Sequence, residues 1–343
     1  MPEKKTSPRQ KTTPRKKSRA APTPDFRPDM EETVGVLATE LAAIYAFERV
    51  KGFGPQKFKQ LADDGINLSS VLMDPDSLPM KGKRGETFRD QLHQITPVVQ
   101  SECLEIAKRQ ISTAHHLGAQ ILTYGEHYPR NVYDSNNPIP ALYIRGGLSV
   151  VSHDRTVACV GSRGIRAPYD LLQREFARVA VSHGFAVVSG FALGADSVAH
   201  LAAREAAGRT ICCMPGGLDR PFPPENRAVW DDFMTYPGAV FVSEFRFGTR
   251  ASSLTLRKRN KLIVAFARGV LVGQSSVSGG AMNAYRFGKE QKKPLATFEA
   301  DGSSDTSGNQ LISDERKDND VVFPKRADEE RYFEWLRKLS SSI

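Results

Sequence analysis

Thr156-Val-Ala-Cys-Val-Gly-Ser-Arg-Gly164 carries the clearest signal of fold in this 343-residue chain. An uninterrupted apolar run, Val157–Val160, is followed at once by a loop that begins and ends with glycine. Short apolar runs bounded by glycine are typical of strands buried on both faces of a parallel sheet. Glycine also lets the backbone turn sharply and approach a ligand closely. The segment therefore predicts a central strand that ends in a candidate binding loop.

The same pattern recurs on both sides of this segment, and helical stretches separate the runs. The expected strands are Ala119–Tyr124, Ala141–Ile144, Thr156–Val160, Ala186–Val188, Thr210–Met214, Ala239–Val242, Gly269–Val272 and Pro294–Thr297. The expected helices are 168–182, 194–207, 225–235, 257–267 and 279–287. Alternating strands and helices predict an α/β fold: a Rossmann-like, mostly parallel sheet with helices on both faces.

Four of the expected strands end in loops of small residues. Each of these loops contains glycine, and together they comprise residues 161–164, 189–196, 215–219 and 273–280. In parallel sheets, ligands bind beyond the carboxyl ends of the strands, and the helix starts that follow attract anions. One such loop could be an ordinary turn, but four at one edge of a sheet favour a phosphate-bearing ligand.

Basic residues accompany these loops. Arg163 and Arg166 follow the first strand, and the run Arg257–Lys261 opens the expected helix before the last glycine-rich loop. The guanidinium fork of arginine suits phosphate, although a basic run on a helix is often only a solvated face. The chain has no P-loop, no G-x-G-x-x-G and no G-x-S-x-G motif, so the usual nucleotide and hydrolase signatures are missing.

A few polar residues remain open to two interpretations. Asp196 and His200 share one helix face, where they form either an acid–base pair or a buried structural pair in which Asp196 caps the helix. We favour the structural pair. Asn226 is expected at a helix start, where it orients the adjoining loop. Glu244 follows a strand and is expected to hold neighbouring backbone or arginine groups rather than to catalyse.

Residues 31–117 are expected to form a small all-α domain, and residues 118–314 the α/β domain. Within the first, Gly52-Phe-Gly-Pro55 separates two helical patterns in the manner of a SAM-like or helix–hairpin–helix unit. Such a glycine turn either binds phosphate through backbone N–H groups or simply joins two packed helices. Residues 315–343 are expected to be a short C-terminal segment with one amphipathic helix at about 328–339.

Residues 1–30 differ from the rest of the chain in composition. They carry nine Lys/Arg and three Asp/Glu, and six prolines, which predicts a disordered basic tail. Such tails bind polyanions, or merely keep a protein soluble. The four cysteines have no metal-ligand or disulfide-scaffold spacing, and no apolar run is long enough to span a membrane. We therefore expect a cytoplasmic protein with no metal, no cofactor and no membrane partner.

The motifs together resemble those of the DNA-processing protein family, DprA, also called Smf. In chain order they are Val160-Gly-Ser-Arg163, Ser189-Gly-Phe-Ala-Leu-Gly-Ala-Asp-Ser-Val-Ala-His200, Gly217-Leu-Asp-Arg-Pro-Phe-Pro-Pro-Glu-Asn226, Ser243-Glu244, Arg259-Asn-Lys-Leu-Ile-Val-Ala265 and Ser278-Gly-Gly280. Further resemblance lies in Tyr124-Gly-Glu-His-Tyr-Pro129 and Gly308-Asn-Gln-Leu-Ile312.

This resemblance implies a non-enzymatic, dimeric protein that binds single-stranded DNA without marked sequence preference. It also implies a mediator of recombination that loads a RecA-type recombinase during natural transformation. The DNA- and phosphate-binding residues expected from the loops and the resemblance are Gly161, Ser162, Arg163, Arg166, Ser189, Gly190, Phe191, Asn226, Lys258, Arg259, Asn260, Lys261, Ser278, Gly279 and Gly280. No catalytic residue is expected.

The chain departs from the family pattern in several places. Lys261 replaces an arginine, Gln274 replaces a glutamate, and Gly280 replaces a serine. The winged-helix tail of many members is expected to be absent or vestigial. An alternative function is that of a Rossmann-type sensor or hydrolase of a nucleotide-derived small molecule. For that reaction, Glu225 is the candidate glutamate near the loop Met214–Gly217.

Overall fold

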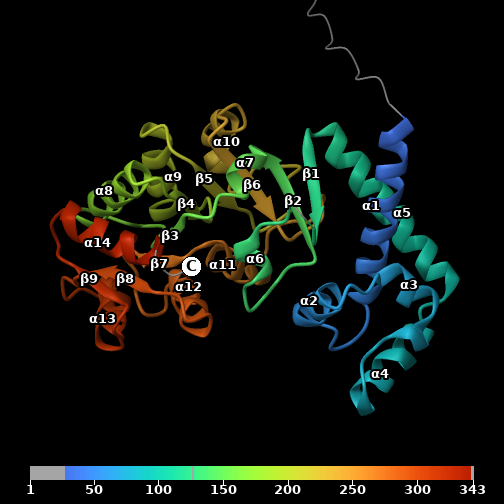
Figure 1. Cartoon of the computed structure of the whole chain (residues 1–343). Helices are drawn as coiled ribbons and strands as arrows, with labels where there is room; N and C mark the ends of the chain where they lie inside the picture. The colour runs from blue at the N-terminus through green and yellow to red at the C-terminus, as the bar shows by residue number, and fades with distance from the viewer. Residues whose placement is uncertain (1–27, 126, 341–343) are drawn as a thin grey trace, which may run out of the picture.

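The computed structural model describes residues 28–125 and 127–340, and the expected basic tail up to residue 27 lies outside them. A helical unit leads into a nine-stranded sheet that is covered by helices on both faces (Figure 1). This arrangement confirms the α/β, Rossmann-like fold with a preceding helical region. Within the described ranges, no helix is both long and apolar enough to cross a membrane.

The helical unit begins earlier than expected, because its first helix already starts at Pro28 and overlaps the last residues assigned to the tail. Its elements are α1 (Pro28–Phe47), α2 (Pro55–Asp63), α3 (Leu68–Met73), the 3-10 helix η1 (Pro75–Ser77), α4 (Gly82–His93) and α5 (Pro97–His116). The glycine turn between α1 and α2 is present, and Gly52 has a φ of 83°. Phe53 in this turn packs edge-on against Phe58 and Phe88, which anchors the turn to the unit's core.

The sheet has the strand order β1-β2-β6-β5-β4-β3-β7-β8-β9. Its strands are β1 (Ala119–Thr123), β2 (Ala141–Gly146), β3 (Thr156–Val160), β4 (Ala186–Ser189), β5 (Thr210–Cys213), β6 (Ala239–Ser243), β7 (Gly269–Val272), β8 (Leu295–Phe298) and β9 (Val321–Phe323). All pairs from β6 to β9 are parallel, whereas β1 and β2 add an antiparallel extension at one edge.

The strand order reverses at β3. From β3 the chain moves outward through β4, β5 and β6, then returns to place β7 on the other side of β3. Val160 at the end of β3 is in register with Val272 at the end of β7. The crevice outside the carboxyl ends of two such strands is the preferred binding site of an open α/β sheet.

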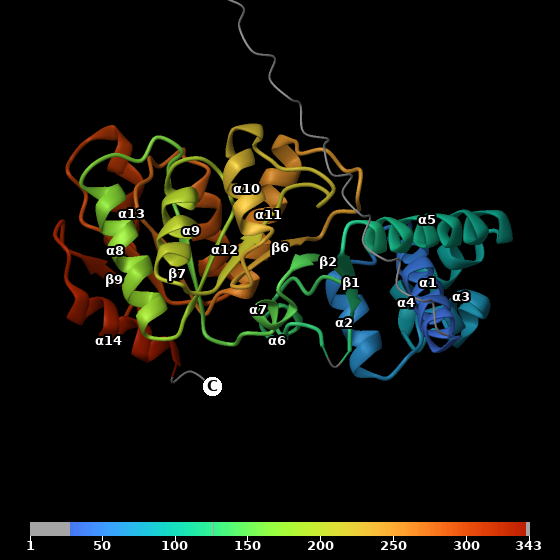
Figure 2. The same ribbon diagram turned by 90° about the horizontal axis from the view of Figure 1, so that it is seen from above.

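Residues alternate between the two faces of β3, and each face packs under its own helices (Figure 2). Val157 and Cys159 contact one cluster, whereas Ala158 and Val160 contact the other. The first face is covered by α8 (Tyr169–Ser182), α9 (Ala195–Glu205), the 3-10 helix η2 (Pro224–Asn226), α10 (Arg227–Phe233) and α14 (Glu329–Ser340). The second is covered by α6 (Arg130–Tyr133), α7 (Leu148–Val151), α11 (Ser253–Phe266), α12 (Ala281–Glu290) and α13 (Ser307–Asp314), which the 3-10 helix η3 (Ser304–Thr306) precedes.

The C-terminal segment extends the sheet beyond the boundary expected at residue 314. It supplies β9, which pairs in parallel with β8, and α14, which packs on α8. Tyr332 of α14 lies 5.4 Å from Phe176 and 4.8 Å from Phe323, measured between ring centroids. The expected amphipathic helix is therefore present, and its apolar face closes the core under this edge of the sheet.

The helical unit is joined to the sheet by one continuous hydrophobic core that runs from Leu41 to Phe247. The hydroxyl groups of Tyr45 and Tyr143 are hydrogen-bonded at 2.5 Å across this junction. Gln110 of α5 accepts a hydrogen bond from the backbone N–H of Phe247 at 2.8 Å and donates one back to its carbonyl at 3.3 Å. These contacts hold the α1–α5 unit against β2 and the loop after β6.

Candidate functional site

A cavity of about 370 Å³ lies where the strand order reverses, and we call it the switch-point pocket. It unites loops that follow β3, β4 and β7 with the exposed side of α11. Of the residues expected in the site, it is lined by Gly161, Ser162, Arg163, Asp196, Arg259, Asn260, Gly279 and Gly280. Three of the four expected loops, those at residues 161–164, 189–196 and 273–280, thus meet at this pocket, whereas no residue of the loop at 215–219 lines it.

Close backbone packing forms the floor of the switch-point pocket. The N–H of Ser162 donates to the carbonyl of Gln274 at 2.7 Å, which ties the β3 loop to the β7 loop. A Cβ at position 161 would lie 2.7 Å from the Cβ of Ala195 and 3.1 Å from the Gln274 carbonyl oxygen. Glycine at this position is thus required by the close approach of three segments.

Two arginines at the rim are free to meet a ligand. Arg163 and Arg257 are exposed and line the switch-point pocket, and no described residue forms an ion pair or side-chain hydrogen bond with either. The first turn of α12 also lines the pocket through Ala281 and Ala284. A helix N-terminus carries partial positive charge, so the two exposed arginines and the start of α12 all favour an anion in this pocket.

Arg259 has a different role from the phosphate contact that was expected. Its guanidinium is only 5% exposed and donates to the carbonyl oxygens of Gly190 and, at 3.1 Å, Cys213. Burial lowers its pKa, and the negative charge of Asp196 opposes that shift. Because its Nη1 donates to both carbonyls, just after β4 and at the end of β5, and its Nε donates to Asn260 Oδ1 at 3.2 Å, we assign Arg259 to positioning these loops.

Three other expected contact residues also have buried side chains. The hydroxyl of Ser189 donates to the carbonyl of Cys159 at 2.6 Å, and Phe191 is 1% exposed within the core. The amide of Asn226 donates to the carbonyl of Phe191 at 2.9 Å and to the hydroxyl of Ser197 at 3.1 Å. These side chains fix the loop after β4, so the expectation of direct contact is corrected to support of the pocket wall.

Asp196 and His200 occupy separate environments although they share a helix face. A carboxylate oxygen of Asp196 accepts from the N–H of Ala192 at 3.3 Å, and burial raises the pKa of this carboxyl. His200 is fully buried, does not line the switch-point pocket, and pairs through Nδ1 with Thr210 Oγ1 at 2.6 Å. Burial, aided by the charge of Arg259, lowers the pKa of His200 to about 3. This geometry favours structural roles for both residues over an acid–base pair, but the expected cap is wrong, because Gly194 is the N-cap of α9 and no side chain caps it in the described structure.

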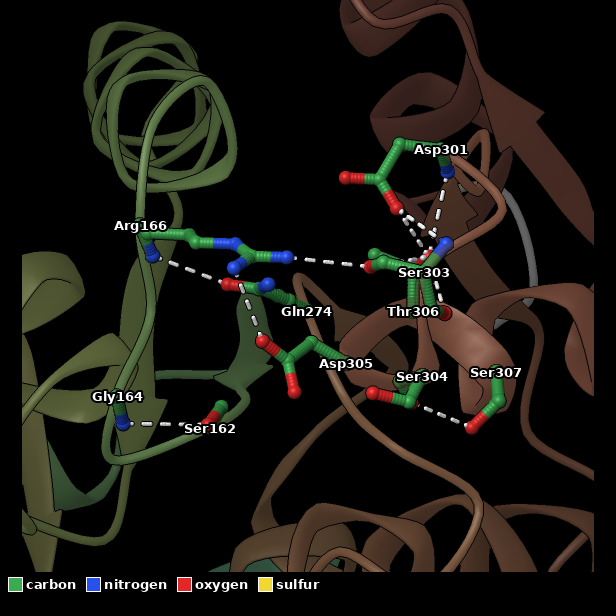
Figure 3. Close-up of polar contacts among 10 residues, drawn as sticks. All are labelled: Ser162, Gly164, Arg166, Gln274, Asp301, Ser303, Ser304, Asp305, Thr306 and Ser307. Carbon is green, nitrogen blue, oxygen red and sulfur yellow. Dashed lines mark hydrogen bonds and ion pairs between the residues drawn. The ribbon is translucent and has the colours of Figure 1, made fainter.

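Arg166 does not line the switch-point pocket and is held by the loop after β8 (Figure 3). Its backbone N–H donates to Gln274 Oε1 at 3.0 Å, and its guanidinium donates to the hydroxyl of Ser303 at 3.2 Å. The guanidinium also forms an ion pair with Asp305 at 3.3 Å. Its charge is therefore partly balanced within the protein.

The glycine-rich loop after β7, residues 273–280, is held in place by hydrogen bonds to α13. The N–H of Ser275 donates to Asn309 Oδ1 at 3.0 Å, and the N–H of Val277 donates to the hydroxyl of Ser307 at 3.0 Å. Ser278 is exposed next to the pocket, whereas Gly279 and Gly280 line it. The loop is thus presented to the pocket on a fixed backbone.

The basic run of α11 divides among three directions. Arg257 and Asn260 line the switch-point pocket, and the buried Arg259 reaches the pocket wall while its guanidinium bonds the carbonyls of Gly190 and Cys213. Lys258 and Lys261 instead line a second cavity, of about 340 Å³, between the helical unit and the sheet. Glu244 lines this second cavity as well, which we call the interdomain pocket.

Some site residues were missed by sequence reasoning. Ser253, Ser276 and Asn283 line the switch-point pocket without belonging to the expected set. Ser276 lies in the loop already singled out, whereas Ser253 and Asn283 lie on the first turns of α11 and α12 and carry no motif of their own. Glu225, the candidate for an enzymatic role, is exposed at η2 and does not line the pocket.

The fold and the pocket define a Rossmann-like protein with a crevice lined by arginines at the switch point of its sheet. Residues 120–318 match the family described as DNA recombination-mediator protein A, and the chain belongs to this family. The suspected DprA/Smf resemblance is thereby confirmed.

Two curated relatives illustrate the match. Protein Smf of Synechocystis is 28% identical over 257 residues, which cover 74% of this chain and 63% of the relative. The chain thus spans less than two thirds of that relative's length. DNA processing protein DprA of Bacillus subtilis is 28% identical over 239 residues, which cover 68% of this chain and 76% of the relative.

Two solved structures share the fold. DprA from Streptococcus pneumoniae matches with a TM-score of 0.63 and 20% identity, over 82% of this chain and 94% of that one. DprA from Helicobacter pylori, described for its unique mode of binding single-stranded DNA, matches with a TM-score of 0.56 and 21% identity. That match covers 66% of this chain and 98% of the Helicobacter chain.

Proposed function

We propose that this protein binds single-stranded DNA in the switch-point pocket through the phosphate backbone. The observation that carries this proposal is the pair of exposed arginines, Arg163 and Arg257, which line the same pocket as the first turn of α12 and have no anionic partner among the described residues. Arginine and backbone dipoles are the groups that proteins use to hold phosphates. The description of the Helicobacter relative, which concerns single-stranded DNA, supports the same ligand.

The remaining parts of the proposal follow from the chemistry of this pocket and from the family. Contacts to phosphates carry no base information, so sequence preference at this pocket is expected to be slight. As a family member, the protein is proposed to act as a cytoplasmic homodimer that helps load a RecA-type recombinase onto DNA taken up by the cell. It performs no chemistry in this role, and the exposed position of Glu225 offers no support for the hydrolase alternative.

A binding titration with the full chain tests the proposal. Labelled single-stranded and double-stranded oligonucleotides of equal length and sequence are compared by fluorescence anisotropy at low and moderate salt. We expect preference for the single strand and a steep loss of affinity with salt, because bound phosphates release counterions. Mononucleotides should not compete at equal nucleotide concentration. Salt-independent binding, or full competition by mononucleotides, would contradict the proposal and favour a sensor of small nucleotides.

A further inference from the structure

Three large apolar side chains are exposed around the switch-point pocket. Leu193, Leu254 and Val277 are 38%, 64% and 46% exposed, and we call them the apolar rim. Each directly follows in the chain a residue that lines the pocket; these lining residues are Ala192, Ser253 and Ser276. The Cα atoms of the apolar rim therefore lie about 3.8 Å from those of lining residues. Isolated exposed apolar residues are ordinary, but three of the eight large ones in the described chain gather here.

The two leucines of the apolar rim adjoin the two exposed arginines of the pocket. Gly194, which follows Leu193, packs on the backbone of Arg163, because a Cβ at position 194 would overlap the Arg163 carbonyl oxygen. Leu254 lies three residues before Arg257 in α11, and residues at this spacing are neighbours on a helix surface. Each exposed cation is thus accompanied by an exposed leucine.

Val277 adds a third apolar point, in the loop after β7. Its N–H donates to the hydroxyl of Ser307 at 3.0 Å, so the backbone that carries this side chain is fixed by α13. Gly279 and Gly280 of the same loop line the pocket. The apolar rim therefore comes from three separate segments, all of which also contribute to the pocket wall.

A single-stranded polynucleotide carries the groups that match this surface. Its phosphates are anionic, and its unpaired bases present apolar faces that proteins cover with side chains. In a duplex the bases are paired and stacked inside the helix, so a protein meets mainly phosphates and the edges of the bases. Arginines beside exposed leucines therefore suit an unpaired strand better than a duplex.

We propose that the apolar rim contacts the faces of unpaired bases next to the phosphates held by Arg163 and Arg257, and that this contact gives the site its preference for single-stranded DNA. The inference rests on the proposed function, because a backbone bound in the switch-point pocket places the bases. Leucine and valine side chains form no hydrogen bonds, so the apolar rim accepts any base. Contact with these side chains releases no counterions, so its loss lowers affinity without changing the salt dependence.

The test compares two single strands of equal length, one of thymidine nucleotides and one of abasic nucleotides that keep the same phosphates. The full wild-type chain should bind the abasic strand about tenfold more weakly, because the leucines lose their apolar contact with the bases. Leu193→Ser/Leu254→Ser should bind the thymidine strand as weakly as the abasic one, with the wild-type salt slope and unchanged affinity for a duplex. Equal affinity of the wild type for both strands, or the wild-type ratio in this variant, would overturn the inference.

Two control variants show whether the apolar surface itself is responsible. Leu193→Met/Leu254→Met keeps apolar side chains and should retain the wild-type ratio of affinities. Val98→Ser should change neither affinity; Val98 is 68% exposed and is the second residue of α5, as Leu254 is of α11. An equal loss in Val98→Ser would overturn the inference. A smaller oligomer of the double serine variant by light scattering, with the wild-type ratio, would also overturn it and would assign the leucines to contacts between copies of the chain.

The same titrations separate this inference from the proposed function. Arg163→Ala should weaken binding of both strands by the same factor and keep the ratio between them. Salt-independent binding of both strands by the wild type would contradict the proposed function. Equal binding of the two strands with a steep salt dependence would instead leave the proposed function in place and remove only the role of the apolar rim.

Discussion

Arg166 and Asp305 form an ion pair of 3.3 Å that joins the loop after β3 to the loop after β8. Both side chains are about half exposed, at 52% and 53%. Asp305 is presented by a loop that is itself fixed, because Asp301 accepts hydrogen bonds from the N–H of Ser303 at 2.9 Å and from Thr306 Oγ1 at 2.7 Å (Figure 3). The pair therefore offsets the positive charge of an arginine in the loop that follows β3.

Replacing this acid should strengthen DNA binding. In Asp305→Asn the guanidinium of Arg166 loses its ionic partner, keeps its hydrogen bond to Ser303, and carries an unbalanced charge that can attract a phosphate. We expect affinity for single-stranded DNA at low salt to rise about two- to fivefold, as is typical for a surface charge, with a steeper salt dependence. Anisotropy titrations measure both quantities. The matched control is Asp318→Asn, an exposed acid in the turn before β9, and an equal gain in that variant would contradict the prediction.

Arg163 offers the direct test of the switch-point pocket. Arg163→Ala should leave the melting temperature unchanged, because the side chain is exposed and has no partner among the described residues. Affinity for single-stranded DNA should fall about tenfold at low salt, and the logarithmic salt slope should decrease by about 0.7 for one lost phosphate contact. Arg316→Ala removes an exposed arginine in the turn after α13 and should change neither quantity. Indistinguishable titrations for Arg163→Ala and wild type would remove this residue from the site.

Gly190 should be intolerant of any side chain. A Cβ at this position would overlap the guanidinium of Arg259, which is buried and donates to the carbonyl of Gly190 itself. Gly190→Ala should therefore lower the free energy of unfolding by about 1–3 kcal/mol, the usual cost of overpacking. Urea denaturation measures this. Gly35→Ala, at an open and exposed position of α1, should instead stabilise the protein slightly, and equal losses in both variants would refute the explanation.

His200 should make the protein sensitive to acid. Its pKa is about 3 in the folded protein because burial disfavours the charged ring, against an ordinary value of 6.5. Between these values the unfolded chain binds the extra proton, so the free energy of unfolding falls as pH decreases, by at most about 1.4 kcal/mol per pH unit. Urea denaturation of His200→Asn between pH 6.5 and pH 4 should show a shallower pH dependence. His116→Asn, at an exposed position of α5, should retain the wild-type slope.

Much of the sheet could be predicted because its strands are buried on both faces. Thr156–Val160 and Gly269–Val272 were expected at their observed bounds, since apolar runs of this kind fit few other structures. β9 was missed because Val321–Phe323 is a short edge strand, only partly buried, and becomes a strand only by pairing with β8. The carboxyl-end location of the pocket followed from the same reasoning.

The directions of the basic side chains could not be predicted in the same way. Successive residues of a helix turn by about 100°, so the run from Arg257 to Lys261 cannot face one ligand. The direction of each of these side chains depends on which side of α11 packs on the sheet and which side packs on the helical unit. Tertiary packing decides this, and the local sequence does not. For the same reason, Ser189 and Asn226 were expected to contact the ligand, although the Ser189 hydroxyl and the Asn226 amide instead donate hydrogen bonds to backbone carbonyls.

The contact of Arg246 with the helical unit limits how the protein can be dissected. Arg246 lies 3.6 Å from the ring centroid of Tyr45 and pairs with Glu48. A fragment that begins at Gly118 would lack the α1–α5 unit, which packs against Tyr143 and Phe247 in the intact chain. An apolar face of the sheet would then be exposed to water. Aggregation of such a fragment would then imitate a loss of DNA affinity, and truncation would be a misleading way to ask what the α1–α5 unit does.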